Sequence, residues 1–395
     1  FKVDKEINSK EIGRGQFLIG LYSIPPGNYR FLKLEIGKAA SAKGEKLFLL
    51  SKKKNEFIYT FPKNLSLDEG DSKCLFLRWN LRASLKGVFT FDPFIVPILQ
   101  GIPLRGELLY VSCNDINTIY VADASENHII ASIGVDSPFG FAIRKEQDSM
   151  YIVSSSQRKI YTLELSTNRI INEFPIPGAV SPTFIVLSQD GSTGYVTDPY
   201  TDSVFKIDMF SGYVIAKKKV GVRPYYILYD YPSNTIFVSS TEDHSVYMVD
   251  PDDLSILGSI RVGDKPEGLL LYKNFICSTD RNSDSITVYD LSERNYYGKV
   301  NIGFEPRRII AWNNKVFVSC YGSDEISIII LNHFIPFKTI KTKKGPLSMD
   351  IYPSRSWLYV AERESKSIGV VDLTTETYIY SIPLPGKPFE LKVVY

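Results

Sequence analysis

Histidine and cysteine are scarce in this sequence. Its 395 residues include 3 His and 4 Cys, whereas each metal or haem site consumes several such ligands. Cys74, Cys113, Cys277 and Cys320 are widely spaced and form no Cys-x-x-Cys or haem-attachment pattern. We therefore expect no metal site, no cofactor and no disulfide framework, and we predict that the cysteines are small buried side chains.

Long apolar runs are also missing. No run of about 18 apolar residues occurs, because Asp, Gly and Pro interrupt the most apolar segment, 88–104. We predict no transmembrane segment. The first residue is Phe1 rather than Met, which favours a processed, exported chain. We expect an extracytoplasmic location (periplasmic, cell-surface or secreted), with peripheral or lipid-anchored membrane association left open.

An excess of one charge is lacking too. The chain has 46 Lys and Arg against 44 Asp and Glu, a formal net charge of +2. Chains that bind phosphate backbones usually carry a much larger basic excess. We therefore predict no nucleic-acid partner.

The sequence is rich in Tyr (25) and Phe (23), which favour strands, and it contains a long internal repeat. A proline that follows a polar turn and precedes an apolar run recurs at intervals of 40 to 44 residues. The seven repeat prolines are Pro138, Pro182, Pro224, Pro266, Pro306, Pro346 and Pro388.

A second motif, a short apolar strand that ends in a small residue, runs in phase with these prolines. Its seven copies are Leu109–Ser112, Met150–Val153, Gly194–Thr197, Ile236–Ser239, Asn274–Cys277, Val316–Ser319 and Leu358–Ala361. Alternating strands such as Ser285–Asp290 follow, which gives four strands in about 42 residues, typical of a β-propeller blade. We predict an all-β chain with a seven-bladed propeller over residues 102–395, whose C-terminal strand completes the first blade.

The Tyr-Val-Ser and Tyr-Val-Thr strands, each followed by a polar turn and a Val-Asp or Tyr-Asp strand, resemble the YVTN repeats of extracytoplasmic and cell-surface propellers. The resemblance covers about residues 104–395 and implies the fold. It leaves function open, because that family includes both surface proteins and redox-enzyme subunits.

Residues 1–101 lack the repeat and carry 17 basic and 10 acidic side chains. Alternating segments at 16–23, 29–36, 46–50, 57–61, 74–79 and 88–91 predict strands. We predict a small β-sandwich domain, immunoglobulin-like or similar, joined to the propeller by a semi-rigid linker over Pro93–Pro103. Lys52, Lys53 and Lys54 are either a docking surface for an acidic partner or a solvated hairpin tip.

Candidates for catalysis are weak. His128, His244 and His333 do not recur at one repeat position, so we expect no triad with a nucleophile. The copper-cluster propeller of nitrous oxide reductase and the haem d1 propellers depend on histidines that these repeats lack. Asp280–Asp284 looks like the start of a calcium loop, but Leu291 stands where a bidentate Glu belongs. We interpret this segment as a turn.

The turn into the innermost strand of each propeller blade borders the central channel, so residues beside the repeat prolines face a shared opening. They offer a grip for an acidic or aromatic group on a ligand or partner, or they form an ordinary charged rim. The candidate binding residues are Arg223, Tyr225, Tyr226, Lys265, Glu267, Glu305, Arg307, Arg308, Lys387, Phe389 and Glu390.

These observations favour an exported, non-enzymatic binding or scaffold protein, with a protein partner or self-assembly through the propeller. One alternative is the propeller subunit of a redox enzyme or cytochrome complex. Another is a propeller hydrolase or lactonase, which the mixed and rather basic rim disfavours. A third is a donor strand at Phe1–Ser9 that completes a neighbouring chain.

Overall fold

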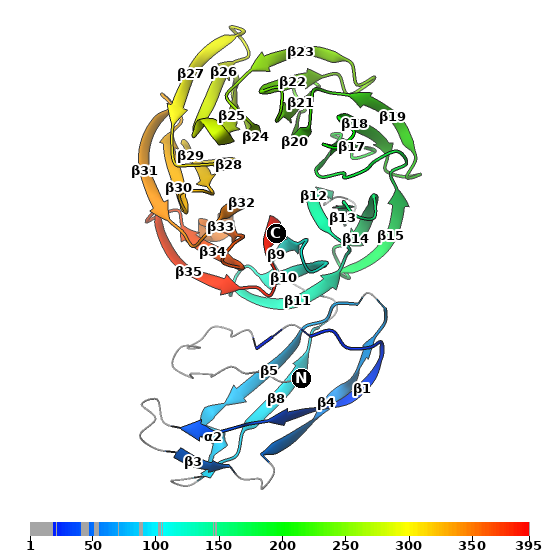
Figure 1. Cartoon of the computed structure of the whole chain (residues 1–395), viewed down its shortest axis with the longest axis vertical. Coiled ribbons are helices and arrows are strands. Elements are labelled where there is room, and N and C mark those ends of the chain that lie inside the picture. The colour runs from blue at the N-terminus through cyan, green and yellow to red at the C-terminus, as the bar shows by residue number, and fades with distance from the viewer. Residues whose placement is uncertain are drawn as a thin grey trace.

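The computed structural model describes residues 19–20, 22–40, 47–50, 55–69, 71–86, 90–101, 104, 106–144, 146 and 148–394. Seven four-stranded antiparallel sheets form a closed ring, with the described residues before Leu104 beside it (Figure 1). The predicted seven-bladed propeller is therefore confirmed. Among the described residues, no helix is long and apolar enough to cross a membrane.

Each blade has four strands, ordered from the ring axis outwards. The innermost strands of blades 1 to 7 are β36 (Pro388–Val394), β12 (Pro138–Arg144), β16 (Ile185–Leu187), β20 (Pro224–Asp230), β24 (Pro266–Tyr272), β28 (Pro306–Trp312) and β32 (Pro346–Tyr352). The second strands are β9 (Leu108–Cys113), β13 (Ser149–Ser154), β17 (Thr193–Asp198), β21 (Thr235–Ser240), β25 (Phe275–Asp280), β29 (Lys315–Cys320) and β33 (Trp357–Glu362).

The third strands are β10 (Thr118–Asp123), β14 (Lys159–Glu164), β18 (Ser203–Asp208), β22 (Ser245–Val249), β26 (Ser285–Asp290), β30 (Glu325–Ile330) and β34 (Ser367–Asp372). The outermost strands are β11 (His128–Gly134), β15 (Arg169–Pro175), β19 (Val214–Lys219), β23 (Ile256–Arg261), β27 (Asn295–Asn301), β31 (Ile335–Lys341) and β35 (Thr377–Pro383). Two short 3-10 helices, η2 (Arg281–Ser283) and η3 (Pro353–Arg355), lie in turns of blades 5 and 7.

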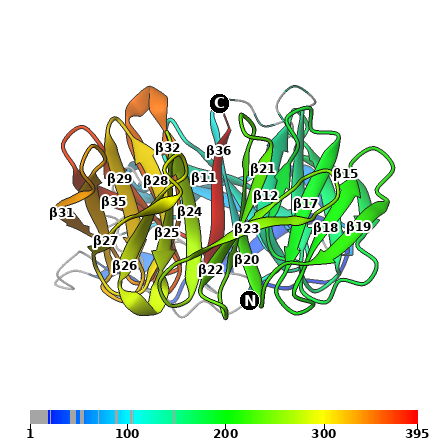
Figure 2. The same cartoon turned by 90° about the horizontal axis from the view of Figure 1, so that it is seen from above.

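The C-terminal strand closes the ring, as predicted. Strand β36 pairs antiparallel with β9, with Leu391 opposite Val111 and Val393 opposite Leu109. Figure 2 shows β36 at the centre of the ring, among strands that come much earlier in the chain. Blade 1 therefore joins the two ends of the propeller sequence, and the strand edge that β9 would otherwise expose is covered.

The Tyr-Val-Ser/Thr motif ties several blades to the next. The Tyr195 hydroxyl of blade 3 donates to the carbonyl of Pro251 in blade 4, at 3.0 Å. Two residues along the same strand, Thr197 donates to the carbonyl of Tyr225, at 2.7 Å. Ser239, Thr279 and Ser319 donate to the next inner strand in the same way. The motif thus satisfies buried carbonyls that an apolar side chain would leave without a partner.

One copy of the motif was predicted in the wrong register. Strand β25 pairs with β24 so that Asp280 lies opposite Pro266 and Cys277 opposite Leu270. The fifth copy is therefore Ile276–Thr279, two residues beyond the predicted Asn274–Cys277. A shift of two residues leaves every side chain on its own face of the sheet, so alternation alone did not reveal it.

The residues before the propeller form three small sheets. Their strands are β1 (Gly27–Glu35), β2 (Ala39–Ala40), β3 (Leu47–Leu50), β4 (Glu56–Leu67), β5 (Leu75–Asn80), β6 (Leu85–Lys86), β7 (Thr90–Phe91) and β8 (Phe94–Leu99), with a short helix, α2 (Leu81–Ser84). The sheet orders are β1-β4, β5-β8 and β2-β3-β7-β6. The sandwich over residues 1–101 and the domain boundary after it stay predictions, and Lys52, Lys53 and Lys54 lie outside the described residues.

The linker prediction was wrong. Most of Pro93–Pro103 is strand β8, which pairs with β5 so that Pro97 lies opposite Leu77. Proline is tolerated there because β8 is an edge strand with a single neighbour, β5. The N–H group that Pro97 lacks is therefore not needed for hydrogen bonds to a second neighbouring strand. Beyond β8, Gln100 contacts blade 1: its side-chain amide accepts from the Ser132 N–H at 3.0 Å and donates to the Ser132 carbonyl at 3.2 Å.

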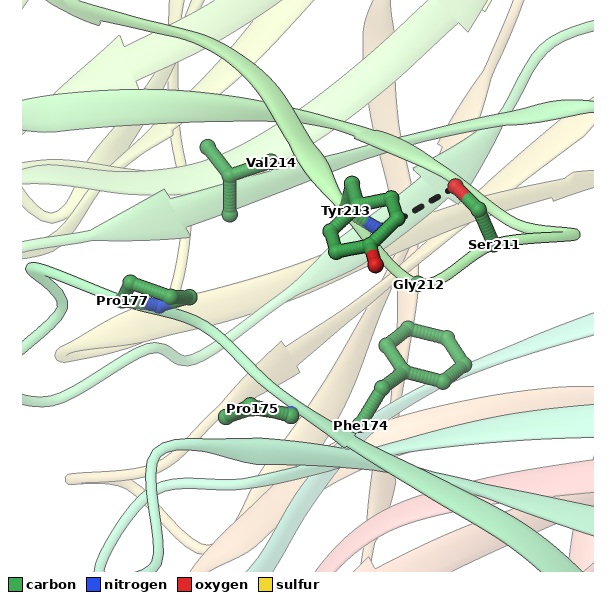
Figure 3. Close-up of a pocket in the computed structure, with 7 residues that line it drawn as sticks. All are labelled: Phe174, Pro175, Pro177, Ser211, Gly212, Tyr213 and Val214. Atoms are coloured by element: carbon green, nitrogen blue, oxygen red, sulfur yellow. Dashed lines mark hydrogen bonds between the residues drawn. The ribbon is translucent and has the colours of Figure 1, made fainter.

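A pocket of about 200 Å³ lies on the outer wall of the ring, between blades 2 and 3 (Figure 3). None of the predicted binding residues lines it.

Candidate functional site

The predicted binding residues separate into an outer and an inner group. The outer group lies on the face of the ring where the chain turns into the repeat prolines, here called the proline face. Arg223 is exposed there, 5.6 Å from the Tyr200 ring. Lys265 and Lys387 lie 3.7 Å from Glu242 and 2.5 Å from Glu364, respectively. These cations are spread over different blades and do not converge on one ligand position.

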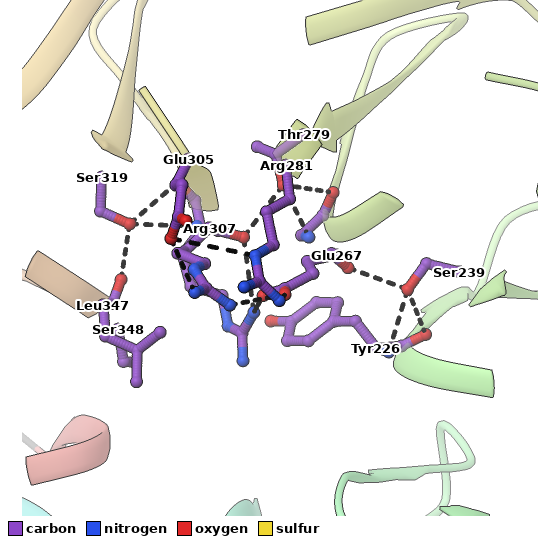
Figure 4. A network of polar contacts seen from close by, with 12 residues as sticks. Tyr226, Ser239, Glu267, Thr279, Arg281, Glu305, Arg307, Ser319, Leu347 and Ser348 are labelled. Atoms are coloured by element: carbon purple, nitrogen blue, oxygen red, sulfur yellow. Dashed lines mark hydrogen bonds and ion pairs between the residues drawn. The ribbon is translucent and has the colours of Figure 1, made fainter. Parts of the chain in front are cut away.

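The inner group is an arginine cluster, defined by Glu267, Arg281, Glu305, Arg307 and Arg308. Figure 4 labels the first four of these residues. Glu267 is its centre, because three guanidinium groups from two blades approach one buried carboxylate. The distances to Glu267 are 2.7 Å from Arg307, 3.6 Å from Arg281 and 3.7 Å from Arg308. Arg307 also donates to Glu305 at 3.1 Å. Much of the basic charge predicted for ligand binding is therefore neutralised within the protein.

Arg308 is 4% exposed and is surrounded by rings. Its guanidinium carbon lies 4.8 Å from the ring centroids of Phe184 and Tyr226 and 5.6 Å from that of Tyr225. Its backbone N–H donates to Ser319, while its Nε and Nη2 have no hydrogen-bond partner among the described residues. Arg308 thus fills an aromatic cage from within the protein, an arrangement favoured by the negative ring faces.

An apolar plug, formed by Phe139, Phe184, Tyr225, Leu347 and Phe389, fills the ring centre at the proline face. The ring centroids of Phe139 and Phe389 are 4.6 Å apart, and those of Phe184 and Phe389 are 5.8 Å apart. These residues come from the inner ends of five blades, so their contact places them around the ring axis. The channel mouth predicted as a shared opening is packed with buried and partly buried side chains.

Charged residues continue along the inner strands beyond the plug. Glu390 is buried, which raises the pKa of its carboxyl group, and it accepts a hydrogen bond from Ser348 at 3.0 Å. The nearby carboxylate of Asp350 raises the pKa of Lys392. A cavity of about 130 Å³ adjoins these groups, and its lining residues are Phe141, Phe184, Ile185, Val186, Tyr226, Ile227, Glu390 and Lys392.

Sequence reasoning missed Asp350 and Lys392, which lie four residues after repeat prolines. Because side chains alternate along a strand, residues four positions after a repeat proline lie beside the channel. The repeat could therefore have predicted the location of Asp350 and Lys392. Arg281 was also missed as a member of the cluster. It follows Asp280 in a turn. The pairing of β25 with β24 places it near Glu267 of the same blade, and the packing of blade 5 against blade 6 brings it to Glu305.

The three histidines lie apart, on blades 1, 4 and 6. His128 is 3.6 Å from Glu126, and His244 is 2.9 Å from Asp264. His333 lies in the turn between β30 and β31. No hydroxyl or thiol is recorded within hydrogen-bond reach of a histidine among the described residues, so the geometry does not assemble a nucleophile–histidine pair.

Asp280, the first residue of the predicted calcium-like turn, has a structural role. It is fully buried, and its carboxylate accepts hydrogen bonds from Thr287 and Ser278. Burial raises the pKa of Asp280 to about 6. The turn itself is the 3-10 helix η2, which ends at Asp284 in the left-handed region, with φ of 49°.

The raised pKa of Asp280 predicts a pH-dependent stability. The native state keeps a proton on Asp280 up to about pH 6, whereas the unfolded chain releases it near 3.8. The unfolding free energy therefore falls as pH rises between these values, and Asp280→Asn should remove this part of the slope. Between about pH 4 and 8, the stability of the variant relative to the wild type should rise by on the order of 2 kcal/mol. Urea unfolding at several pH values measures both slopes, and equal slopes would contradict the prediction.

The fold defines the class of protein: a seven-bladed β-propeller closed by its C-terminal strand. No protein-family model and no curated protein matches this chain by sequence. Solved structures match it in three dimensions. A functionally unknown protein from Desulfotomaculum acetoxidans superposes with a TM-score of 0.64 at 12% identity, over 73% of this chain and 99% of that one.

Other structures with this likeness have different functions. A putative 6-phosphogluconolactonase from Bacteroides fragilis matches with a TM-score of 0.63 at 12% identity, over 73% of this chain and 98% of that one. Hydrazine synthase from Kuenenia stuttgartiensis matches with a TM-score of 0.56 at 14% identity, over 65% of this chain and 95% of that one. At such identities the likeness establishes the fold alone.

Proposed function

We propose that this chain is an exported, non-enzymatic binding protein of the YVTN-repeat type, which docks a protein partner on its proline face. The observation that carries the proposal is the apolar plug. Since side chains fill the channel mouth, a partner at this face meets packed side chains and surrounding turns rather than an open channel. Such a surface suits a macromolecule better than a small substrate, which binds best in a concave pocket.

The turns around the plug expose apolar and aromatic side chains. The exposed fractions are 54% for Val180, 69% for Tyr200, 47% for Val222 and 63% for Phe304. Val180, Val222 and Phe304 precede repeat prolines, and Tyr200 lies beside Arg223 on the same face. Tyr, Phe and Arg are enriched at protein interfaces, where a few of them supply most of the binding energy.

The redox-subunit alternative uses the same face, with the chemistry in the docked partner, so it differs from the proposal in what binds. The lactonase alternative needs a site for substrate chemistry. The arginine cluster offers little support for one, because its carboxylates are occupied by arginines of the same protein.

Isolation of the native protein from its source membrane or culture fluid, with identification of whatever co-purifies, tests this proposal. The wild type should retain a protein partner, and the double variant Tyr200→Ala with Phe304→Ala should weaken its binding by at least about tenfold. Both side chains are exposed, so the fold should be unchanged. Ile256→Ala with Ile379→Ala, on exposed outer strands, is the matched control. Equal retention by both variants, or a wild type that remains a clean monomer after mild cross-linking, would overturn the proposal.

A further inference from the structure

Among the described residues, strand β19 of blade 3 leaves one side unpaired on the outer wall of the ring. The sheet order is β16-β17-β18-β19, so β19 hydrogen-bonds to β18 alone. Its outward side therefore presents alternating backbone N–H and carbonyl groups, which can pair with another extended chain. Ile215, the second residue of β19, is 55% exposed.

The outer-wall pocket lies beside this edge (Figure 3). Phe174, Pro175 and Pro177 form one wall, and the turn that leads into β19 forms the other, through Tyr213 and Val214. The lining is mostly apolar, and the Tyr213 side chain is freely accessible, at 77% exposed. A pocket of about 200 Å³ has room for one aliphatic or proline side chain, not for a whole ligand.

Hydrogen bonds hold together the turn that forms the pocket. The Asp208 carboxylate accepts from the N–H groups of Phe210 and Ser211 at 2.9 and 2.8 Å, and Gly212 donates to the Asp208 carbonyl at 2.8 Å. Gly212 has φ of 74°, and a Cβ there would lie 2.7 Å from Phe174. Glycine at this position therefore lets the turn approach Phe174 closely, so the pocket exists before any partner arrives.

The same edge is basic. Lys217, Lys218 and Lys219 are consecutive and exposed at the end of β19. Lys217 donates to the carbonyl of Gly178 at 2.9 Å, beside the pocket wall, and Lys218 lies 3.9 Å from Asp253. Other outer strands also expose apolar residues, but β19 combines them with a formed pocket and three adjacent cations. The complementary partner is acidic.

Blade 1 shows how an outer edge accepts a partner. Its outermost strand, β11, uses both backbone groups of Ser132 to hydrogen-bond the Gln100 side-chain amide, which takes the place of a neighbouring strand. Ser72 adds a hydroxyl contact to Ser132 at 3.1 Å. At Ser132 the edge of blade 1 is thus covered by residues that precede the propeller, whereas among the described residues β19 has no such cover.

We propose that β19 and the outer-wall pocket bind an extended acidic segment of a partner protein by strand addition. The backbone of that segment pairs with the outer edge of β19, its acidic side chains meet Lys217–Lys219, and one aliphatic or proline side chain enters the pocket. Backbone pairing supplies affinity in this mode of recognition, and the pocket supplies selectivity.

Two labelled heptapeptides test this inference by fluorescence anisotropy with the full chain: Glu-Val-Glu-Leu-Glu-Val-Glu, and the same peptide with Lys in place of Glu. The acidic peptide should bind saturably and the basic one should not. The variant Tyr213→Ala with Lys219→Glu should weaken binding at least about tenfold. The matched control, Tyr296→Ala with Lys299→Glu on the outer strand of blade 5, should change it less than about twofold.

Three results would overturn the inference: no saturable binding of the acidic peptide up to about 1 mM, an equal loss in both variants, or a preference for anionic phosphatidylserine vesicles that the Tyr213 variant shares with wild type. The peptide measurements use no native partner, so their result does not depend on what the isolation experiment finds at the proline face.

Discussion

Deletion of residues 389–395 should abolish cooperative folding of the propeller. The deletion removes most of β36, including the buried side chains of Phe389, Leu391 and Val393. Burial of each such side chain contributes about 1.5–3 kcal/mol, so the combined loss is comparable to the net stability of a typical domain, about 5–15 kcal/mol. It also uncovers the edge of β9 and removes Phe389 from the apolar plug.

Thermal melting followed by circular dichroism, together with limited proteolysis, measures this effect. The truncated chain should show no sharp transition, and a synthetic peptide of residues 388–395 added in excess should restore part of it. Ile379→Ala, on the exposed outer strand β35, is the control and should shift stability by less than about 1 kcal/mol. An unchanged melting temperature after truncation would contradict closure of the ring by β36.

Glu267→Gln should be among the most destabilising single substitutions in the propeller. Glu267 is buried and lies within 4 Å of Arg281, Arg307 and Arg308. Loss of its negative charge leaves the buried Arg308 guanidinium without its ion-pair partner and leaves Arg307 with Glu305 alone. Removal of one partner of a buried ion pair costs about 3–5 kcal/mol. Urea unfolding at neutral pH should report a loss of this size.

Two further variants make this prediction specific. Glu364→Gln removes the partner of Lys387 at a half-exposed pair, and it should cost less than about 1 kcal/mol because solvent screens that pair. Arg308→Met combined with Glu267→Gln should recover part of the loss, since it removes one uncompensated buried charge. A Glu267→Gln loss no larger than that of Glu364→Gln would contradict the role given to the arginine cluster.

Much of the architecture could be read from periodicity. A Pro every 40–44 residues and alternating strands specify four-stranded blades, because strand side chains must alternate between the two faces of a sheet buried on both sides. Ring closure also followed from sequence, since the first Tyr-Val strand lacked an inner neighbour and the last proline-led strand lacked a second one. The region before the propeller has no repeat, so its strands could not be recognised by comparison of several copies. The prolines of Pro93–Pro103 therefore led to the prediction of a linker where β8 lies.

For the candidate site, the repeat predicted where residues lie but not what surrounds them. The repeat identified which residues stand beside the inner strands, and Tyr225, Glu267, Arg307 and Arg308 do meet near the ring axis. Sequence alone could not decide whether they face solvent or one another. Their ionic partners lie up to 40 residues away along the chain, as for Arg307 and Glu267, and the apolar plug draws on five blades.

The sequence by itself determined the blade count, the strand order within each blade and the closure of the ring, because these depend on local alternation repeated seven times. Only the tertiary structure decided that the channel mouth is packed, that Arg308 is caged by rings and that β19 has an open edge beside a pocket. Those features depend on side-chain size and charge summed across blades, which no single repeat contains. Periodic information specifies the scaffold, and the differences between repeats, once brought together around one axis, specify the surfaces available for binding.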